Sequence, residues 1–396
     1  MTLFLLCNSL DEIGGVQRVV RTLADEFIRS GTQIELIGFR DAAEPHRLSS
    51  RFHPPEHRLF RPWWPVRLLG RRRLEKLGFG GNRIERLRFF ERRRAVRELR
   101  RRLEGAGDGA CIAMDVFAAQ LLAEAAPPGT VTLFQFHNSF GAVEGAADLA
   151  RIGSLVGRID ALVALTAEDA RAFEAAGLGA WHFVNNPLPY EPPAPEGPRE
   201  KLVVSVGRFT DQKAYDLLLQ AWALAGEATA GWRLEIHGRG PQEDLLRDRL
   251  RALGLGNAAI LPPTDDVPGL LSRASIYALS SAYEGLPMVL LEALAFGVPV
   301  VATDCSAGVR QLVAEAGSGL VGPVGDAAAL AENLKRLLGD PALRQRLGEA
   351  GRAGIRPYLP GPVVARWRSL IADLRAAKEG RRAASAASGN HCSAAL

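Results

Sequence analysis

The sequence predicts an α/β protein made of two doubly wound domains, and three observations support this fold class. The chain has 396 residues, which is too long for one ordinary domain and suits two. Strand patterns alternate with amphipathic helix patterns in both halves, as parallel sheets with crossover helices require. Between the halves, residues 187–198 contain six prolines, which indicates a stiff, extended linker.

The first half is expected to form one parallel sheet. Apolar runs typical of strands buried on both faces lie at residues 3–8, 34–39, 110–114, 131–136, 161–165 and 183–185. The spacing of apolar residues predicts helices at 16–27 and 83–104, and Thr166 resembles the start of a capping box with Asp169. Residues 41–82 contain five prolines and are expected to be irregular.

The second half repeats this alternation. Strands are expected at residues 203–207, 234–238, 276–279 and 298–302, followed by a last helix at 360–374. We therefore expect a first domain at 1–187, a linker at 188–200, a second domain at 201–357, and a C-terminal helix at 358–375 that packs back on the first domain. Residues 376–396 are rich in Ala, Ser and Gly and are expected to be disordered.

Composition and cysteine spacing predict a globular, cytoplasmic protein. Hydrophobic residues make up 47% and charged residues 23%, which is typical of globular chains. The four cysteines are scattered without CxxC spacing, so we expect neither a zinc ribbon nor a disulfide framework. No basic leader is present, and the longest apolar stretch is interrupted by Glu292 and two prolines, so we expect neither a signal peptide nor a membrane span.

The net charge of +5 is concentrated in one segment. Between Arg51 and Glu104 there are eighteen Arg or Lys residues against six Glu and no Asp. A basic stripe of this kind attracts phosphates or an anionic membrane surface. A solvated helix face with many salt bridges has the same composition, and the sequence leaves both possibilities open.

Glu284 and Glu292 frame a candidate anion-binding segment. Pro287 suits the first turn of a helix, so Glu284 is expected in the preceding loop and Glu292 within the helix. The amides from Gly285 to Val289 would then present the positive end of the helix dipole to an anion. Glu292 lies in a very apolar helix and needs polar partners, which sugar hydroxyls would supply. Alternatively, Glu284 is a solvated loop residue and Glu292 is paired with a nearby arginine.

Arg208 and Lys213 follow the strand expected at 203–207, so they should lie at the carboxyl end of the second sheet. Ligands of doubly wound sheets bind at this end, and two cations there can neutralise a diphosphate. The alternative is that both are ordinary surface cations near the start of a helix, although acids are preferred at that position.

Taken together, these motifs resemble the donor domain of retaining glycosyltransferase family 4, which has the GT-B fold of two facing Rossmann-like domains with a cleft between them. The resemblance covers nearly the whole chain and is strongest from Val203 to Leu338. It also takes in Gly14-Gly15, Phe136-His137, Asn185-Asn186-Pro187, Gly207-Arg208, Gly238-Arg239-Gly240 and Gly319-Leu320-Val321.

The resemblance implies a role for each candidate residue. Glu284 would hold hydroxyls of the transferred sugar and Glu292 the ribose, while Arg208 and Lys213 would bind the diphosphate. His137 would lie near the reacting centre. The residues implied to contact the donor are Gly14, Gly15, Gly238, Leu261, Gly285, Leu286, Pro287, Met288, Val289 and Glu292.

Two features depart from the family pattern or bear on it. Ala214 follows Lys213 where glycine is common; alanine can follow a helix cap without strain, so we expect little effect. The chain has no Asp-x-Asp motif, which argues against a donor site built around a divalent metal. We therefore expect no metal and no cofactor other than the nucleotide-sugar substrate.

The implied function is retaining transfer of a hexosyl unit from a UDP-sugar to a glycan or lipid-linked glycan, in synthesis of cell-surface polysaccharide such as lipopolysaccharide. The first domain would bind the acceptor, and the segment from Arg58 to Arg102 would suit the inner face of a membrane. Two alternatives stay open: a sugar-nucleotide epimerase of the same fold, and a nucleic-acid-binding protein, for which no motif appears. Neither glycine pair completes a G-x-G-x-x-G motif, which disfavours a nicotinamide oxidoreductase.

Overall fold

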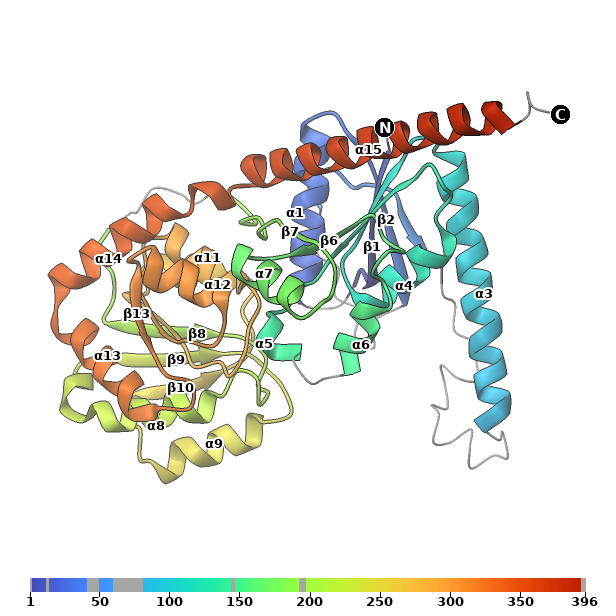
Figure 1. The fold of residues 1–396 in the computed structure, drawn as a ribbon. Coiled ribbons are helices and arrows are strands. Elements are labelled where there is room, and N and C mark those ends of the chain that lie inside the picture. The colour runs from blue at the N-terminus through green and yellow to red at the C-terminus, as the bar shows by residue number, and fades with distance from the viewer. Residues whose placement is uncertain are drawn as a thin grey trace. The chain divides into compact units, whose positions relative to one another are not determined.

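The computed structural model describes residues 2–11, 14–40, 50–59, 81–143, 147–191 and 197–392, except for the side chains of 81–88 and 385–392. The chain forms two compact α/β units, each built around one parallel sheet (Figure 1). The first comprises Met1–His137, Gly145–Val184 and Val363–Leu396, and the second comprises Asn138–Glu144 and Asn185–Pro362. The predicted two-domain α/β fold is confirmed.

Seven described strands form the sheet of the first unit, in the order β3-β2-β1-β4-β5-β6-β7, and all their pairings are parallel. Leu5 of β1 lies between Leu36 of β2 and Ile112 of β4, and all three are fully buried. The strands are β1 (Thr2–Ser9), β2 (Gln33–Arg40), β3 (Glu56–Arg58), β4 (Ala110–Ala113), β5 (Val131–Gln135), β6 (Ala161–Ala164) and β7 (Trp181–Phe183). The helices are α1 (Gly15–Arg29), α3 (Gly81–Gly105), α4 (Val116–Ala125), α6 (Ala147–Gly153), α7 (Ala167–Ala175) and α15 (Pro360–Cys392), which begins in the second unit.

The second unit has six described strands in the order β10-β9-β8-β11-β12-β13, again all parallel. They are β8 (Leu202–Val206), β9 (Arg233–His237), β10 (Ala258–Leu261), β11 (Ile276–Leu279), β12 (Val300–Thr303) and β13 (Gly319–Gly322). Its α-helices are α5 (Phe140–Val143), α8 (Tyr215–Ala225), α9 (Glu243–Ala252), α10 (Val267–Arg273), α11 (Met288–Ala295), α12 (Ala307–Arg310), α13 (Ala327–Gly339) and α14 (Pro341–Gly354). Shorter turns of helix are η1 (Gly226–Thr229), the π-helical η2 (Gln311–Glu315) and η3 (Arg356–Tyr358).

The buried strands were predicted, and the strands that the sequence did not predict lie at sheet edges. β3, β10 and β13 are edge strands, and their side chains are only partly buried for the most part. A half-exposed strand does not need the continuous apolar run that marks a central strand, so its sequence carries no strong signal. The edge strand β7 was predicted two residues too late for the same reason.

The C-terminal helix is much longer than predicted. α15 continues to Cys392, so the prediction of a disordered tail from residue 376 is wrong over 376–392. Contacts with the first unit explain part of this, because Arg375 donates to the Asp108 carbonyl at 2.7 Å and Lys378 lies 2.7 Å from Asp160. Alanine and arginine, both strong helix formers, are frequent beyond these contacts.

The side chains of Cys7, Cys111 and Cys305 are free thiols. Thr166 Oγ1 accepts from the Asp169 amide at 3.1 Å at the start of α7, which confirms the predicted cap. Of the basic segment from Arg58 to Arg102, residues 60–80 lie outside the described residues.

Ala214 adopts a backbone conformation that alanine disfavours. It is the N-cap of α8, with φ +46° and ψ 46° in the left-handed region. The expectation that alanine is unstrained here is therefore wrong, because a Cβ in this region costs about 1–2 kcal/mol. Glycine has no such cost, which is a physical reason for glycine to be favoured after this lysine.

Replacing Ala214 by glycine is expected to raise the free energy of unfolding by roughly 0.5–1 kcal/mol, because relief of strain exceeds the added chain entropy. Ala223→Gly, within the same helix, is the matched control and should lower stability by a similar amount. Urea unfolding followed by circular dichroism measures both. If both variants are destabilised alike, Ala214 is not strained.

Candidate functional site

The candidate site lies at the topological switch point of the second sheet. β9 and β10 extend the sheet on one side of β8, whereas β11, β12 and β13 extend it on the other. The loops after β8 and β11 therefore diverge at this point, where doubly wound sheets bind ligands. The first loop carries Arg208 and Lys213, and the second carries Glu284.

Hydrogen bonds fasten these two loops to each other. The Ala282 amide donates to the Gln212 carbonyl at 2.7 Å, and Gln212 Nε2 donates to the Tyr283 carbonyl at 3.1 Å. Ser280 Oγ donates to the Lys213 carbonyl at 2.8 Å. The loops are thus held in one register, which fixes where their charged side chains start.

Lys213 and Glu284 form an ion pair within this frame. Lys213 Nζ lies 2.5 Å from Glu284 Oε1, and the same oxygen accepts a hydrogen bond from Ser281 Oγ at 2.7 Å. The Lys213 and Glu284 side chains are only 17% and 8% exposed, so salt screens the pair weakly. An ammonium has three donors, so Lys213 can bind a further anionic oxygen without releasing Glu284.

Ser281 was not predicted, although one signal could have identified it. It follows β11 by two residues and therefore lies at the carboxyl end of a strand next to the switch point. Its hydroxyl orients the Glu284 carboxylate, and its own carbonyl accepts from Thr303 Oγ1 at 2.6 Å. The second contact ties this loop to the end of β12.

Two buried tyrosines, Tyr215 and Tyr277, lie beside the ion pair. A Cβ at Gly207 would lie 2.7 Å from the Tyr215 hydroxyl and 3.1 Å from Lys213 Cε, so glycine gives the lysine stem room at this turn. Burial raises the pKa of both tyrosines, and the nearby charge of Glu284 raises it further. Both phenols therefore stay neutral at physiological pH.

Hydrogen bonds from Ser306, which follows β12, and from Asn186 hold the loop that leads into α11. Ser306 Oγ donates to the Gly285 carbonyl at 3.0 Å, and Asn186 Nδ2 donates to the Leu286 carbonyl at 3.3 Å. A Cβ at Gly308 would lie 2.2 Å from the Gly285 carbonyl, so this close approach requires glycine. The loop is therefore fixed before any ligand binds.

Helix α11 places both glutamates where the sequence predicted them. It begins at Met288 with Pro287 as N-cap, so Glu284 lies in the preceding loop and Glu292 lies inside the helix. The amides of Met288 and Val289 have no intrahelical acceptor. Glu292 is fully buried and interacts with other groups of the chain, and its contact with sugar hydroxyls stays a prediction.

Two exposed arginines lie on neighbouring loops of this unit. Arg208 follows β8 and Arg239 follows β9, and the Phe209 amide donates to the Arg239 carbonyl at 2.9 Å. Within the described residues, neither guanidinium has a hydrogen bond or ion pair, so Arg208 does not join the Lys213 pair in this structure. Arg239 was given no role from sequence, although it too follows the carboxyl end of a strand.

Gly238 has a packing reason to be glycine. A Cβ there would lie 1.9 Å from the Gly207 carbonyl and 2.7 Å from the Phe209 ring. Its amide donates to the carbonyl of Leu261, the last residue of β10, at 3.0 Å. Contact of Gly238 and Leu261 with a donor stays a prediction.

His137 lies in the first unit, just beyond the end of β5. Its Nε2 is 3.4 Å from Met114 Sδ, and burial lowers the pKa of the imidazole to about 4. The ring is therefore neutral at physiological pH and can donate or accept a hydrogen bond, but carries no charge.

Gly14 and Gly15 also belong to the first unit. Gly14 is the extended N-cap of α1, and Gly15 is its first residue. A Cβ at Gly14 would meet the movable end of Gln17, at 2.6 Å from Oε1. The backbone here does not itself demand glycine, so the ligand role of this loop stays a prediction.

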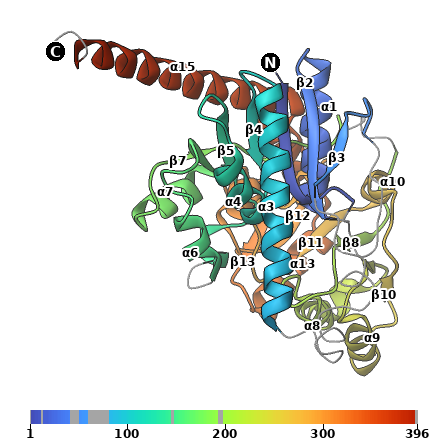
Figure 2. The ribbon, with the colours of Figure 1, turned by 90° about the vertical axis from the view of Figure 1, so that its right-hand side faces the viewer.

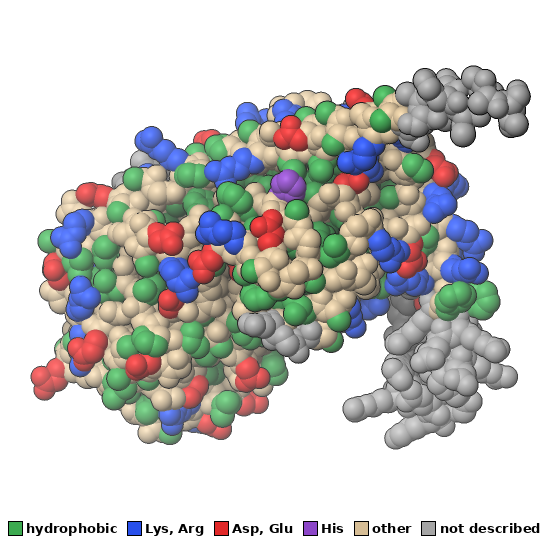
Figure 3. All heavy atoms as spheres, in the orientation of Figure 1, with side chains coloured by type: hydrophobic (Ala, Val, Ile, Leu, Met, Phe, Trp, Pro, Cys, Tyr) green, Lys and Arg blue, Asp and Glu red, His purple; other side chains and the backbone are tan. Residues whose placement is uncertain are grey.

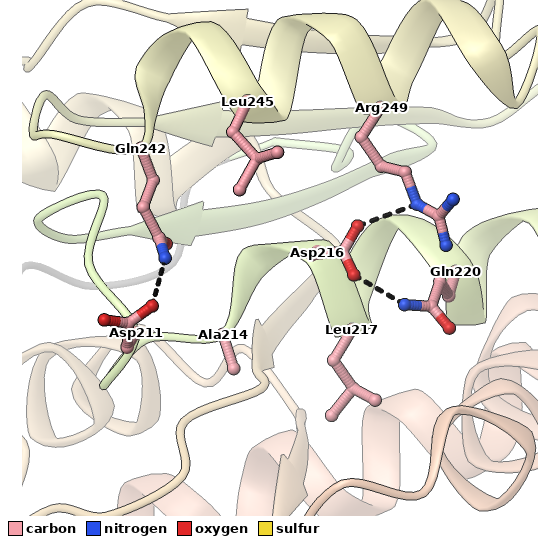
Figure 4. Close-up of a pocket in the computed structure, with 8 residues that line it drawn as sticks. All are labelled: Asp211, Ala214, Asp216, Leu217, Gln220, Gln242, Leu245 and Arg249. Carbon is pink, nitrogen blue, oxygen red and sulfur yellow. Dashed lines mark hydrogen bonds and ion pairs between the residues drawn. The ribbon is translucent and has the colours of Figure 1, made fainter.

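A surface hollow is lined by residues of α8, of the loop before it, and of α9 with its N-cap (Figure 4). Asp216, on its wall, forms an ion pair with Arg249 at 2.7 Å and accepts a hydrogen bond from Gln220. Asp211 accepts a hydrogen bond from Gln242. Leu217 and Leu245 add apolar surface. The predicted site residues do not line this hollow, and its polar groups already bond to one another.

No helix in the described part of the chain is both long and apolar enough to cross a bilayer. No group of three or more His, Cys, Asp or Glu side chains in the described residues could hold a metal ion.

The Lys213–Glu284 pair lies in a segment that matches a family model. Residues 191–354 match the family described as Glycosyl transferases group 1. The chain is 32% identical over 172 residues to an uncharacterized glycosyltransferase of Haemophilus influenzae, covering 43% of this chain and 49% of that protein. It is 28% identical over 174 residues to the amylovoran biosynthesis glycosyltransferase AmsD of Erwinia amylovora, covering 44% and 48%. The chain thus spans about half or less of the curated relatives that it matches.

Structural comparison extends over nearly the whole chain. S. aureus TarM, solved with fondaparinux, α-GlcNAc-glycerol and UDP, superposes with a TM-score of 0.74 at 13% sequence identity, covering 93% of this chain and 99% of TarM. The fold is therefore GT-B, as predicted.

The lowered pKa of His137 predicts a pH dependence of stability. The pKa is about 4 in the folded chain against an ordinary value of 6.5, so the unfolded chain takes up this proton first as the pH falls. The contribution of neutral His137 to the free energy of unfolding is fully present above pH 6.5 and is lost as the pH falls from about 6.5 towards 4.

Unfolding midpoints of His137→Gln should fall less over this pH range than those of wild type. His182→Gln, at an exposed position of β7, is the control; equal slopes for wild type and His137→Gln would contradict the assignment.

Proposed function

We propose that the protein is a metal-independent, retaining glycosyltransferase of family 4 that transfers a hexosyl unit from a UDP-sugar to a glycan or lipid-linked glycan. The observation that carries this proposal is the Lys213–Glu284 pair at the switch point of the segment that matches Glycosyl transferases group 1. The names of the relatives support a role in bacterial surface polysaccharide synthesis, since AmsD is named for amylovoran biosynthesis. A cytoplasmic location stays a prediction.

Lys213 binds the donor diphosphate in this proposal. Its remaining N–H donors can bind phosphate oxygens while Glu284 holds the third, and low exposure makes these bonds stronger than in water. As the sugar–phosphate bond breaks, negative charge grows on the leaving diphosphate, and a fixed cation stabilises that charge most. Arg208 and Arg239 are exposed cations on the loops after β8 and β9, and in this proposal they bind the same anion.

Glu284 serves the transferred sugar. Oε1 is engaged by Lys213 and Ser281, which orient the carboxylate, and Oε2 can accept hydrogen bonds from sugar hydroxyls. The amides of Met288 and Val289 at the start of α11 supply neutral donors for the phosphates. The negative Glu284 thus positions the sugar while the cations and amides hold the diphosphate.

His137 would act as a neutral hydrogen-bond partner for sugar or acceptor hydroxyls, because its pKa of about 4 leaves the ring uncharged. We propose a front-face route, in which the departing phosphate accepts the proton of the acceptor hydroxyl. This route requires no carboxylate nucleophile. It accounts for retention of configuration at the anomeric carbon.

An epimerase of the same fold is the second candidate, and the comparisons do not favour it because the matched family and relatives are named as transferases. The two activities differ in their products. A transferase releases nucleoside diphosphate in proportion to glycosylated acceptor, whereas an epimerase interconverts nucleotide sugars without any acceptor.

Lys213→Ala is expected to lower turnover by about 10²–10³-fold, as loss of one preorganised charge-stabilising donor does. The readout is UDP release from a panel of UDP-hexoses, with and without bacterial glycolipid extract, in the presence of a chelator. Lys201→Ala is the matched control, because Lys201 is exposed and precedes β8 whereas Lys213 follows it.

Unfolding midpoints under assay conditions separate loss of a phosphate contact from loss of the fold. Turnover of folded Lys213→Ala near that of Lys201→Ala would overturn the role of Lys213. Activity that disappears with chelator and returns with Mg²⁺ would overturn the metal-free account.

A further inference from the structure

Helix α3 of the first unit has one side buried and one side exposed. Ala95, Leu99 and Leu103 are buried, and the helix packs against α4. Arg92 forms an ion pair with Glu124 of α4 at 2.5 Å. Figures 1 and 2 show α3 as a long, straight helix that continues beyond the sheet of its unit.

The exposed side carries aromatic and cationic residues. At about 100° of rotation per residue, seven of them fall within one arc of roughly 140°. One is Arg100, which donates to the carbonyls of Glu124 and Ala125 of α4. The other six are Phe89, Phe90, Arg93, Arg94, Arg97 and Arg101. We call this set the α3 outer face. Figure 3 shows basic side chains gathered along this helix beside a hydrophobic patch.

The two phenylalanines are unusually exposed for large apolar side chains. Phe89 is 53% and Phe90 is 64% exposed, and they meet edge to face with centroids 6.1 Å apart. Adjacent aromatic side chains left in water on a charged helix indicate a surface that becomes covered.

The charge of the outer face is only partly neutralised within the chain. Glu98 pairs with Arg101 at 2.6 Å and with Arg102 at 3.1 Å. Arg93, Arg94 and Arg97 have no acidic partner among the described residues. The outer face therefore combines unneutralised guanidinium groups with exposed rings, and Glu104 is the one acidic side chain that follows on the same arc.

We infer that the α3 outer face binds the surface of an anionic lipid bilayer, with the two phenylalanines in the interfacial layer and the arginines on lipid phosphates. Single-stranded nucleic acid is the other polyanion that uses aromatic and basic groups, but it requires free ring faces for stacking. Arg93 already lies over the Phe89 ring, 4.9 Å from its centroid. The inference does not rest on the proposed reaction, since bilayer binding needs neither donor nor acceptor.

Vesicle co-sedimentation of the full chain tests the inference. Wild type is compared on phosphatidylcholine vesicles and on vesicles that contain about one third phosphatidylglycerol. We expect binding to the anionic vesicles and little to the neutral ones. Arg93→Gln/Arg94→Gln/Arg97→Gln should bind anionic vesicles about a hundredfold more weakly, since each basic residue near the surface contributes about tenfold or less.

Phe89→Gln/Phe90→Gln should weaken vesicle binding by about tenfold or more while keeping the charge. Its matched control is Leu224→Gln/Leu245→Gln, which removes side chains that are 54% and 57% exposed in the second unit. Arg171→Gln/Arg336→Gln/Arg346→Gln is the control for the charge variant, because these arginines are exposed elsewhere. Both control proteins should bind as wild type does.

Circular dichroism and unfolding midpoints establish that each variant is folded. Equal binding of wild type to neutral and anionic vesicles would overturn the inference. So would outer-face variants that bind as tightly as their controls. Tighter binding to single-stranded RNA than to anionic vesicles, lost in the phenylalanine variant, would assign the face to nucleic acid and equally overturn it.

Discussion

The buried ion pair between Lys213 and Glu284 is the interaction on which the candidate site depends. Removing two charges from water costs several kcal/mol per ion, and close geometry with further hydrogen bonds is needed to offset that cost. Here the offset comes from a 2.5 Å contact, the Ser281 hydroxyl, and two loops joined by backbone hydrogen bonds. The groups around the ion pair are therefore held in place before any ligand binds, as preorganised charge stabilisation requires.

The loop that carries Lys213 contains one residue with a strained backbone and one glycine in close contact with neighbouring side chains. Ala214 is held in a left-handed conformation directly after Lys213, and Gly207 leaves just enough room for the lysine stem beside Tyr215. Strained residues persist only where the surrounding structure fixes them, and they gather at functional sites. We therefore attribute the strain at Ala214 to the placement of the Lys213 side chain beside Glu284.

Most of the fold could be predicted from the sequence, as could the position of both loops at the carboxyl end of the second sheet. Central strands need continuous apolar runs, and carboxyl ends of parallel strands meet at one edge. Edge strands such as β3 carry no such pattern. The ion pair between Lys213 and Glu284 was not predicted, and Arg208, which was expected beside Lys213, does not join it. The partners of Glu292 and the left-handed φ of Ala214 depend on tertiary packing, which local sequence does not record.

The central claim is that Lys213 binds the diphosphate of a donor, and calorimetric titration with UDP and with uridine tests it most directly. The account predicts that wild type binds UDP far more tightly than uridine. In folded Lys213→Ala, UDP affinity should fall by about tenfold or more, as loss of a charge-assisted hydrogen bond implies, while uridine affinity is unchanged. If wild type and Lys213→Ala discriminate between UDP and uridine to the same degree, the diphosphate does not bind at Lys213 and the account fails.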